Sequence, residues 1–388
     1  MTMPSYQCLT TPLRLFHGAD SLGQLGKELD RLKASRAVIF CGGSLARNTA
    51  LLDKVRNALG PRCAGMFAGV KAHSPVPDVL LATEDLRRLN ADAVVAVGGG
   101  SAIVTARAAS ILLAEGTDVG ALCTVPDGKG GLKSPRLMAA KLPQFVIPTT
   151  PTTAAVKAGS ALFNPALGER QALFDPKTRA AAIFIDPDMM LSAPRALVSS
   201  AGVNTLSTAI EGLMSRAGNP VSDALLMHSV RLLAQHLGAG ADLDDAAIRG
   251  ESALAALLCG QGTDHTGAGI TTVLGHALGA RFDVENGTIN AIVLPHVLAF
   301  NADHGAKGLA KVGAALGESG GDLLPAVVDA VQRSFASLGM PARLRDVGIP
   351  AEELKDIAQI AMGDWFLKGN PRPVQSAAEL LDILEKAW

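Results

Sequence analysis

Apolar runs and amphipathic stretches alternate along roughly the first half of the chain. Five short apolar runs have the composition of buried strands, and residues 45–59 and 78–89 space their apolar positions as helices do. Strands that alternate with helices are typical of a parallel sheet covered by helices. The predicted strands are Ala37–Cys41, Ala64–Ala68, Ala93–Val97, Gln144–Ile147 and Ala181–Ile185.

From about Pro194 onward the pattern changes to apolar residues spaced three and four apart, with almost no β-branched alternation. This spacing predicts an all-helical second half. Asp186-Pro187 marks the exit from the first half, because a proline disfavours helix in the residue before it. We therefore expect an α/β domain over residues 1–190 and a helical domain over residues 191–388.

Composition narrows the class of protein. The chain has 388 residues, 48% of them hydrophobic, which is enough for two buried cores. A net charge of −1 lacks the basic excess of a nucleic-acid-binding protein, and five scattered cysteines without a CxxC pair favour reduced thiols. The polar N-terminus has no secretory leader, and Arg107 interrupts the most apolar run, Ala93–Ala114. We expect a cytoplasmic protein with a small-molecule partner and no membrane span.

Gly98, Gly99, Gly100 and Ser101 follow a predicted strand and open a predicted helix. At such a helix start, backbone N–H groups and the positive end of the helix dipole attract phosphate. The segment is not the GxGxxG fingerprint, and a tight turn without a ligand is the alternative. We favour a site for the diphosphate of a dinucleotide.

Two further turns are candidates for the same cofactor. The hydroxyls of Thr149, Thr150 and Thr153 follow the strand that ends at Ile147. After the first strand, Gly42 and Ser44 stand where dinucleotide folds often place the acid that holds the ribose 2′-OH. Because no carboxylate stands there and Arg47 follows, NADPH is permitted as well as NADH. That Arg47 is simply a solvated helix residue is an equal alternative.

The eight histidines include no HExxH or similarly close pair, so spacing alone predicts no metal site. His276 has small neighbours in Leu274–Gly279 that would let a ligand approach its ring. A lone histidine on an apolar helix is more often a core residue. A catalytic role for His276 therefore needs support from other parts of the chain.

Seven segments spread over nearly the whole chain carry such support: Ala93–Arg107, Ile147–Thr150, Ile185–Pro187, Gly202–Glu211, Gly275–Gly279, Asn290–Asn301 and Asn370–Val374. In this order they resemble the iron-containing alcohol dehydrogenase family. Ala64–Val76 and the missing acid after the first strand are most similar to its maleylacetate reductase branch. The resemblance implies an N-terminal dinucleotide-binding α/β domain with a parallel sheet and an all-helical C-terminal domain. Between them lies a cleft where hydride passes from nicotinamide to a carbonyl.

Metal-dependent members of this family hold a divalent ion with one Asp and three His. The resemblance places these ligands on Asn204, Thr208, Thr272 and Asn286. Neutral amides and hydroxyls are poor ligands for a transition metal, so we predict no catalytic metal. We expect the four side chains to donate hydrogen bonds to a developing oxyanion, with His276 as proton donor. The alternative is a dead pocket filled by a local amide network.

The cofactor turn also departs from the family pattern. Members of the family continue after IPTT with a glycine-rich turn, whereas this chain has Thr and Ala at residues 152–155, which restrict φ and crowd the approach of the nicotinamide. Lys157 is expected to compensate as a cation near a diphosphate or an acidic substrate, and Arg281 to bind the substrate. Arg170 stands where the family often has a Lys at the cofactor ribose.

The sequence thus predicts a metal-independent NAD(P)H-dependent reductase of a small, acidic carbonyl compound or of an activated C=C or C=N bond. A homodimer is expected, because family members are commonly dimers or larger. Two rivals stay open: a lyase, cyclase or isomerase on the same scaffold, and a catalytically silent binding protein. A change in NAD(P)H absorbance on turnover separates the reductase from both.

Overall fold

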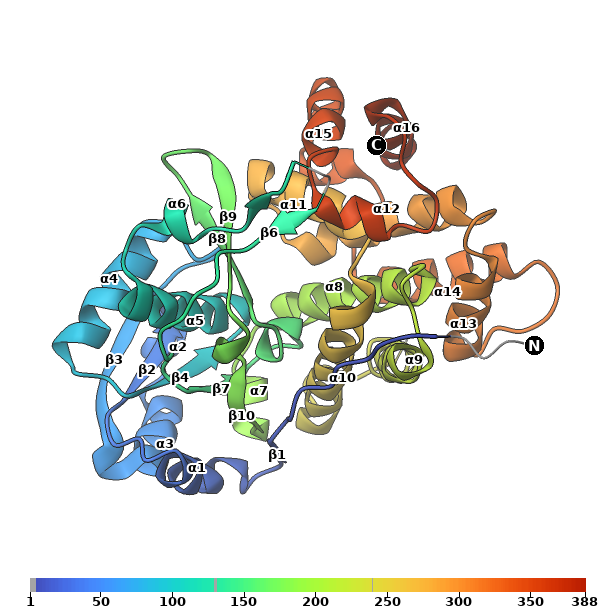
Figure 1. The fold of residues 1–388 in the computed structure, drawn as a ribbon. Coiled ribbons are helices and arrows are strands. Elements are labelled where there is room, and N and C mark those ends of the chain that lie inside the picture. Colours follow the sequence, from blue (N-terminus) through green and yellow to red (C-terminus); the bar gives the residue numbers. More distant parts are fainter. Residues whose placement is uncertain (1–4, 129–130, 239) are drawn as a thin grey trace. The chain divides into compact units, whose positions relative to one another are not determined.

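The computed structural model describes residues 5–128, 131–238 and 240–388. They form two compact units, Thr11–Ala193 in blue to green and Pro194–Trp388 in yellow-green to red in Figure 1. The boundary differs by three residues from the expected one. The described part of the first ten residues groups with the second unit, where Cys8 Sγ lies 3.4 Å from His265 Nε2, and the hydrophobic pattern gave no sign of this. Among the described helices, none combines the length and the apolar character that a membrane span needs.

A six-stranded sheet forms the centre of the first unit, and all of its strands are parallel. The strand order is β1-β10-β7-β4-β2-β3. All five predicted strands are present, and only the edge strand β1 was missed, because three residues are too few to show a period. The strands are β1 (Leu15–His17), β2 (Ala37–Gly42), β3 (Cys63–Val70), β4 (Ala93–Gly98), β7 (Gln144–Pro148) and β10 (Ala180–Ile185).

Helices cover both faces of this sheet (Figure 1). Successive side chains of a strand point to opposite faces, and Ile39, Val95 and Phe145 pack on one face in a cluster with helices α1 and α3. Helices α4 and α5 pack against each other, and α5 also packs against β4. The helices are α1 (Leu25–Arg31), α3 (Thr49–Leu59), α4 (Val76–Arg88) and α5 (Gly100–Glu115).

Antiparallel strands outside this sheet were not predicted. Strands β8 (Gly159–Asn164) and β9 (Glu169–Phe174) form a hairpin, and the two-residue strands β5 (Val125–Pro126) and β6 (Leu132–Lys133) form a second antiparallel pair. Both pairs consist of short, partly polar segments, which a search for apolar runs passes over.

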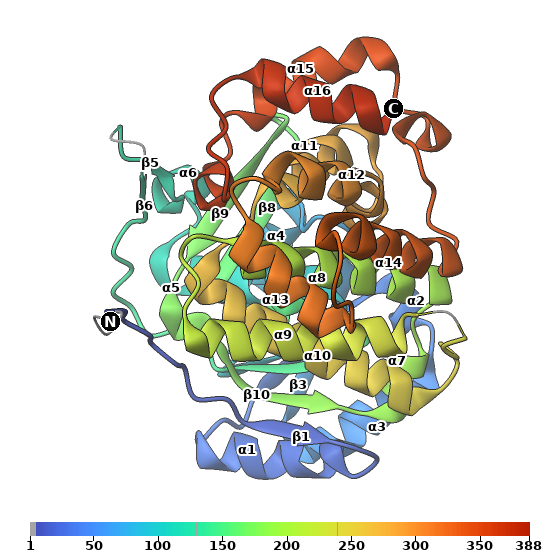
Figure 2. The same ribbon diagram turned by 90° about the vertical axis from the view of Figure 1, so that its right-hand side faces the viewer.

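The second unit is helical throughout its described residues, as its spacing predicts. Figure 2 shows α9 beside α10 and α15 beside α16, and each pair is in contact. Leu274, Ile289, Ile357 and Leu380 join four of the helices in one buried cluster. The helices are α8 (Arg195–Met214), α9 (Pro220–His236), α10 (Ala246–Thr266), α11 (Ile270–Phe282), α12 (Asn286–Asn301), α13 (Ala306–Leu316), α14 (Leu323–Ser337), α15 (Leu354–Ala361) and α16 (Ala377–Ala387).

Candidate active site

The carboxyl ends of β2, β4 and β7 carry most of the residues predicted to bind the cofactor. These parallel strands are neighbours in the sheet. The chain passes from β2 to β3 on one side and returns to β4 on the other, so the strand order reverses between β2 and β4. Dinucleotides and flavins bind at the carboxyl ends beside such a switch point. Gly42 ends β2 and Ser44 follows it, and Gly98 ends β4 with residues 99–101 after it, so both segments flank the switch point.

The glycine turn brings two backbone segments into close contact. Gly98 ends β4 with φ at +144°, a conformation that glycine adopts readily and other residues avoid. A Cβ atom on Gly99 would lie 3.1 Å from Thr150 Oγ1, and one on Gly100 would lie 3.3 Å from Thr152 Oγ1. Helix α5 begins at Gly100, so its first N–H groups lie beside threonine hydroxyls, an arrangement that suits an anion.

The threonine turn is attached to the glycine turn through the backbone. Thr149 N donates to Gly98 O at 3.1 Å. Thr149 and Thr150 are buried, whereas Thr153 is half-buried at the start of the short 3-10 helix Thr153–Ala155. The structure therefore brings Thr149 and Thr150 against the glycine turn and holds Thr153 a few residues beyond it.

Two arginines form hydrogen bonds to the backbone of residues 154–159. This backbone belongs to the segment where members of the family that the sequence resembles have a glycine-rich turn. Arg107 is fully buried in α5, and its guanidinium donates to the carbonyl oxygens of Ala154 and Gly159, both at 2.6 Å. Arg179 donates to Val156 O. Burial, together with the neighbouring Arg179, lowers the pKa of Arg107 to about 9, so this buried charge is costly. The two guanidiniums satisfy carbonyls that an irregular buried segment would otherwise leave without donors.

Lys157 and Arg170 occupy different places in the first unit. Lys157 N donates to Ala154 O, so the residue is attached to the segment that Arg107 holds. Arg170 lies on β9, opposite Phe163 in the hairpin and outside the six-stranded sheet. Of the two, Lys157 is the one whose segment is continuous with the threonine turn.

Ser44 and Arg47 form a small polar group after β2. Both are exposed, and Arg47 Nη2 donates to Ser44 Oγ at 3.4 Å. A hydroxyl and a guanidinium at this end of the strand suit a ribose phosphate, whereas the acid that would repel it is missing.

The second unit carries the remaining predicted residues on helices that pack together. Helices α8, α11 and α12 contact one another. Between Val198 and Met214 of α8, all residues are buried except Ala201, Asn204 and Thr208, which are half-buried. Between Ile270 and Gly279 of α11, only Thr272, His276 and Ala277 do so, and half-buried Asn286 begins α12. We call Asn204, Thr208, Thr272, His276 and Asn286 the polar strip.

Two hydroxyl protons of the polar strip are used inside the protein. Thr208 Oγ1 donates to Asn204 O at 2.7 Å, and Thr272 Oγ1 donates to Glu211 Oε2 at 2.7 Å. In this arrangement each hydroxyl offers lone pairs, and no proton, to a ligand. The donor role expected of four side chains therefore falls to the amides of Asn204 and Asn286.

Asn290 connects the three helices through its amide, which is 1% exposed. Its side chain lies 3.0 Å from the amide of Asn204 on α8. Turned so that its nitrogen faces the nearby carbonyls, it donates to Thr271 O on α11 and to Asn286 O on α12, both at 3.1 Å. Asn290 begins a segment identified from the sequence, but no role was predicted for it.

Glu211 is a buried carboxyl group that sequence reasoning missed. Its Oε1 accepts from Thr271 N at 2.5 Å and its Oε2 from Thr272 N at 3.1 Å, so it lies at the first turn of α11. Burial raises the pKa of the carboxyl, while the hydrogen bonds from Thr272 and Thr271 act in the opposite direction. The sequence signal that could have identified this residue is the acidic side chain at the end of the segment Gly202–Glu211.

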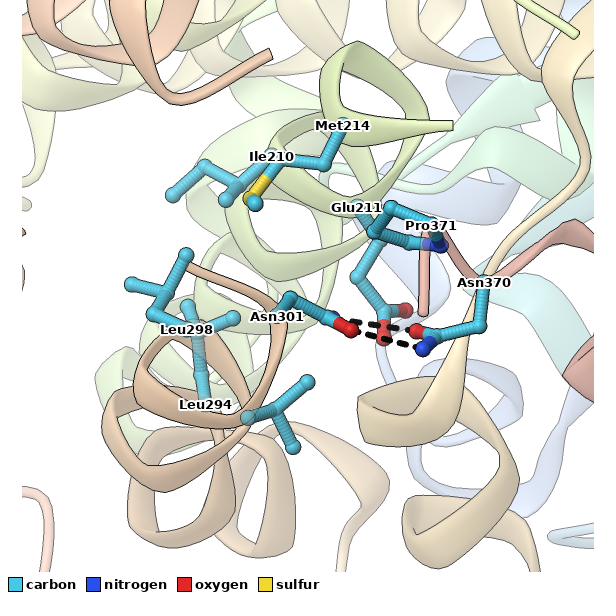
Figure 3. A pocket seen from close by; sticks show the side chains of 9 residues that line it. Ile210, Glu211, Met214, Leu294, Leu298, Asn301, Asn370 and Pro371 are labelled. Atoms are coloured by element: carbon cyan, nitrogen blue, oxygen red, sulfur yellow. Dashed lines mark hydrogen bonds between the residues drawn. The ribbon is translucent and has the colours of Figure 1, made fainter. Parts of the chain in front are cut away.

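Glu211 also lines a cavity of about 10 Å³. Figure 3 shows Glu211 beside Asn301 and Asn370, whose amides bond to each other at 3.1 and 2.7 Å. A void of this size admits one water molecule. The cavity is therefore too small to hold a substrate.

Asp364 is a second functional candidate that the sequence did not single out. Its Oδ2 lies 3.5 Å from His276 Nδ1, and its Oδ1 accepts from Phe366 N at 2.9 Å. A carboxylate held in this way can orient the imidazole ring through Nδ1. Arg281, in contrast, forms an ion pair with Glu353, so its charge is already balanced within the unit.

The donor set of the polar strip does not fit a transition-metal ion. The positions of the family's ligands carry amides and hydroxyls, and both hydroxyl protons are directed to protein acceptors. In the part of the chain that the structure describes, no three His, Cys, Asp or Glu side chains are placed to share a metal. We therefore assign no step of the chemistry to a metal.

Two family models match consecutive parts of the chain. Residues 12–187 match iron-containing alcohol dehydrogenase, and residues 198–388 match the C-terminal part of the Fe-containing alcohol dehydrogenase family.

Individual relatives match nearly the whole length. The chain is 30% identical over 383 residues to lactaldehyde reductase of Escherichia coli (strain K12), which covers 96% of this chain and 97% of that protein. It is 28% identical over 377 residues to maleylacetate reductase of Sphingobium indicum, and the match covers 97% of this chain and 95% of that protein. The crystal structure of a 1,3-propanediol oxidoreductase has the same fold, with a TM-score of 0.90 at 24% identity. The match covers 99% of this chain and 100% of that chain.

Proposed function

Since the chain belongs to the iron-containing alcohol dehydrogenase family, we propose that it uses NADPH or NADH to reduce the carbonyl group of a small molecule without a transition-metal ion. The family makes it an oxidoreductase; the carbonyl substrate and the absence of a metal are our proposal. The observation that carries it is the polar strip, in which neutral polar groups keep accessible surface on otherwise buried helices.

The α/β unit supplies the cofactor site in this proposal. The first N–H groups of α5 bind the diphosphate, and Thr149 and Thr150 border them. Ser44 and Arg47 receive the 2′-phosphate of NADPH. Arg107 supports this site indirectly, because it forms a hydrogen bond to the backbone that follows the threonine turn.

The amides of the polar strip stabilise the charge that hydride transfer creates. Hydride addition to a carbonyl carbon leaves negative charge on its oxygen. One well-placed hydrogen-bond donor is worth about 3 kcal/mol to such a transition state. Asn204 and Asn286 together therefore approach the several kcal/mol that a Lewis acid contributes in related chemistry.

His276 supplies the proton that converts the alkoxide into the alcohol. Imidazole is suited to this step because its ordinary pKa lies near neutral pH. Asp364 stabilises the imidazolium form before the proton leaves and fixes the plane of the ring. The residue thus gains the support that its lone position in the sequence did not provide.

The substrate that we propose is a small acidic carbonyl compound. Lys157 supplies a cation next to the cofactor turn, and the similarity to the Sphingobium maleylacetate reductase points in the same direction. Arg281 is less suited to substrate binding than the sequence suggested, because Glu353 already pairs with it.

The test is NADPH oxidation with maleylacetate, lactaldehyde and simple aldehydes, before and after dialysis against a chelator. We expect turnover with at least one carbonyl, no loss on chelation, and no gain when zinc or ferrous ion is added. His276→Ala should lower kcat strongly, whereas His304→Ala, at an exposed histidine after α12, should not. Stoichiometric iron or zinc in active protein would contradict metal independence. Conversion of a compound without a change in NADPH would favour a lyase or isomerase.

A further inference from the structure

An aromatic pair adjoins His276 in the second unit. Trp365 and Phe366 stack with ring centroids 4.0 Å apart and an interplanar angle of 29°. The Phe366 ring lies 6.0 Å from the His276 ring at an angle of 50°. The three rings therefore form a continuous row that begins at the imidazole and ends at the indole.

Trp365 is one of the two tryptophans of the chain and is exposed, whereas the other has a structural role. Only 4% of the residues are aromatic, and two of them are tryptophans. Trp388 is used structurally, since its Nε1 donates to Ile349 O at 2.8 Å and its ring lies under Arg345. Trp365 instead remains 47% exposed and stacks on Phe366, the ring that lies next to the proposed proton donor. Aromatic side chains together with a few polar groups commonly line ligand sites.

The backbone keeps this row in place. Asp364 Oδ1 accepts from Phe366 N at 2.9 Å and caps the 3-10 helix Trp365–Gly369. The other oxygen of the same carboxylate faces His276 Nδ1 at 3.5 Å. One residue therefore contacts both the imidazole and the backbone that carries the aromatic pair.

The geometry points to a subsite for a planar ring: the carbonyl group of the substrate lies at His276 and its aromatic substituent packs against the stacked pair of Phe366 and Trp365. This inference rests on the proposed function and narrows its substrate class to acidic carbonyl compounds that also carry an aryl or similarly flat substituent, for which neutral aryl aldehydes serve as probes. A flat π face matches an indole better than a puckered ring of the same size, because aromatic pairs gain about 0.5–1.5 kcal/mol beyond the area they bury, or about 2- to 10-fold.

Benzaldehyde and cyclohexanecarbaldehyde form a matched pair of substrates, since both carry a six-membered ring on the carbonyl carbon. We expect kcat/KM to favour benzaldehyde. Trp365→Leu should reduce that preference about 2- to 10-fold, Trp365→Phe should retain it, and Trp388→Phe should leave it unchanged. An exposed position tolerates these substitutions, and a thermal unfolding scan checks that they do not perturb the fold. An unchanged preference in Trp365→Leu would overturn the subsite.

Fluorescence tests the subsite without turnover. In Trp388→Phe the sole tryptophan is Trp365. Benzyl alcohol should quench its emission saturably, and cyclohexylmethanol should not. Equal quenching by both alcohols, or saturable quenching by oxidised cofactor alone, would overturn the assignment to a substrate ring. If no carbonyl compound is reduced by any variant, the proposed function fails, and the titration still decides whether Trp365 binds a planar ring.

Discussion

Asn204 and Thr208 permit a direct test of how the polar strip stabilises charge. They lie one turn apart on α8, both half-buried, and each has an apolar replacement of similar shape, Leu and Val. The Asn204 amide can donate to an oxyanion, whereas the Thr208 hydroxyl donates to Asn204 O at 2.7 Å. The two substitutions should therefore have different kinetic effects although they remove neighbouring polar groups.

The expected magnitudes follow from these hydrogen bonds. Loss of one oxyanion donor costs about 2.7–4 kcal/mol, so Asn204→Leu should lower kcat by about 10²- to 10³-fold. Thr208→Val removes a hydrogen bond worth about 1 kcal/mol to the fold and should change kcat less than about fivefold. Asn204→Leu also leaves the buried Asn290 amide without one partner, which costs about 1–3 kcal/mol of stability.

Steady-state kinetics at saturating NADPH, with thermal unfolding and NADPH affinity measured in parallel, separate catalysis from folding. Thr205→Val is the control, because Thr205 forms the same type of bond to the backbone, to Ala201 O at 2.9 Å, but is fully buried. Equal losses of kcat in Asn204→Leu and Thr208→Val would refute the donor assignment. So would a loss below about tenfold in Asn204→Leu.

Three further predictions concern other parts of the molecule. Arg47→Ala should weaken NADPH about tenfold or more and leave NADH unchanged in a binding titration, since it removes a charge-assisted contact to the 2′-phosphate; equal losses for both cofactors would contradict this. Burial raises the pKa of Glu211, so its ionisation destabilises the folded state as pH rises above about 4.5 and through the raised value. Thermal midpoints of Glu211→Gln should therefore fall less steeply with pH over that range than those of the wild type, and parallel curves would exclude the effect. Gly275→Ala places a Cβ 2.3 Å from the side-chain amide of Asn290, so kcat should drop although alanine favours the helix by about 1 kcal/mol; an unchanged kcat would show that Asn290 is not needed.

The fold was predictable because its signals are local and repeated. Buried strands such as Ala93–Val97 appear as apolar runs, and glycine at 98–100 marks the junction of a strand with a helix. The hairpin of β8 and β9 is different, since its strands pair with each other outside the main sheet and half of the residues of each strand are not apolar. Residues 5–10 show no helical or strand periodicity of apolar residues, so only three-dimensional contacts place them with the helical unit.

The candidate site was predictable in its members and less so in their chemistry. Residue type and resemblance identified Thr208 and Thr272, but whether a hydroxyl donates or accepts depends on which oxygen lies beside it. Thr208 donates to the backbone of its own helix, whereas the partner of Thr272, Glu211, is 61 residues away in the sequence. Asp364 was missed for the same reason, because it is 88 residues from His276.

Replacing a metal by amides changes what the surrounding helices must do. A metal ion gathers its own ligands, whereas an amide has to be aimed by the packing around it before the substrate arrives. The two glycines of the segment Gly275–Gly279 serve this purpose: a Cβ on Gly275 would lie 2.3 Å from the side-chain amide of Asn290, and one on Gly279 would lie 2.5 Å from Asn286 Oδ1. Helix α11 therefore approaches α12 closely enough to confine both amides, and Asn290 in turn contacts Asn204 on α8 at 3.0 Å. The rigidity that a metal would supply through coordination is supplied here by close helix packing, so side chains that touch no ligand should affect the rate.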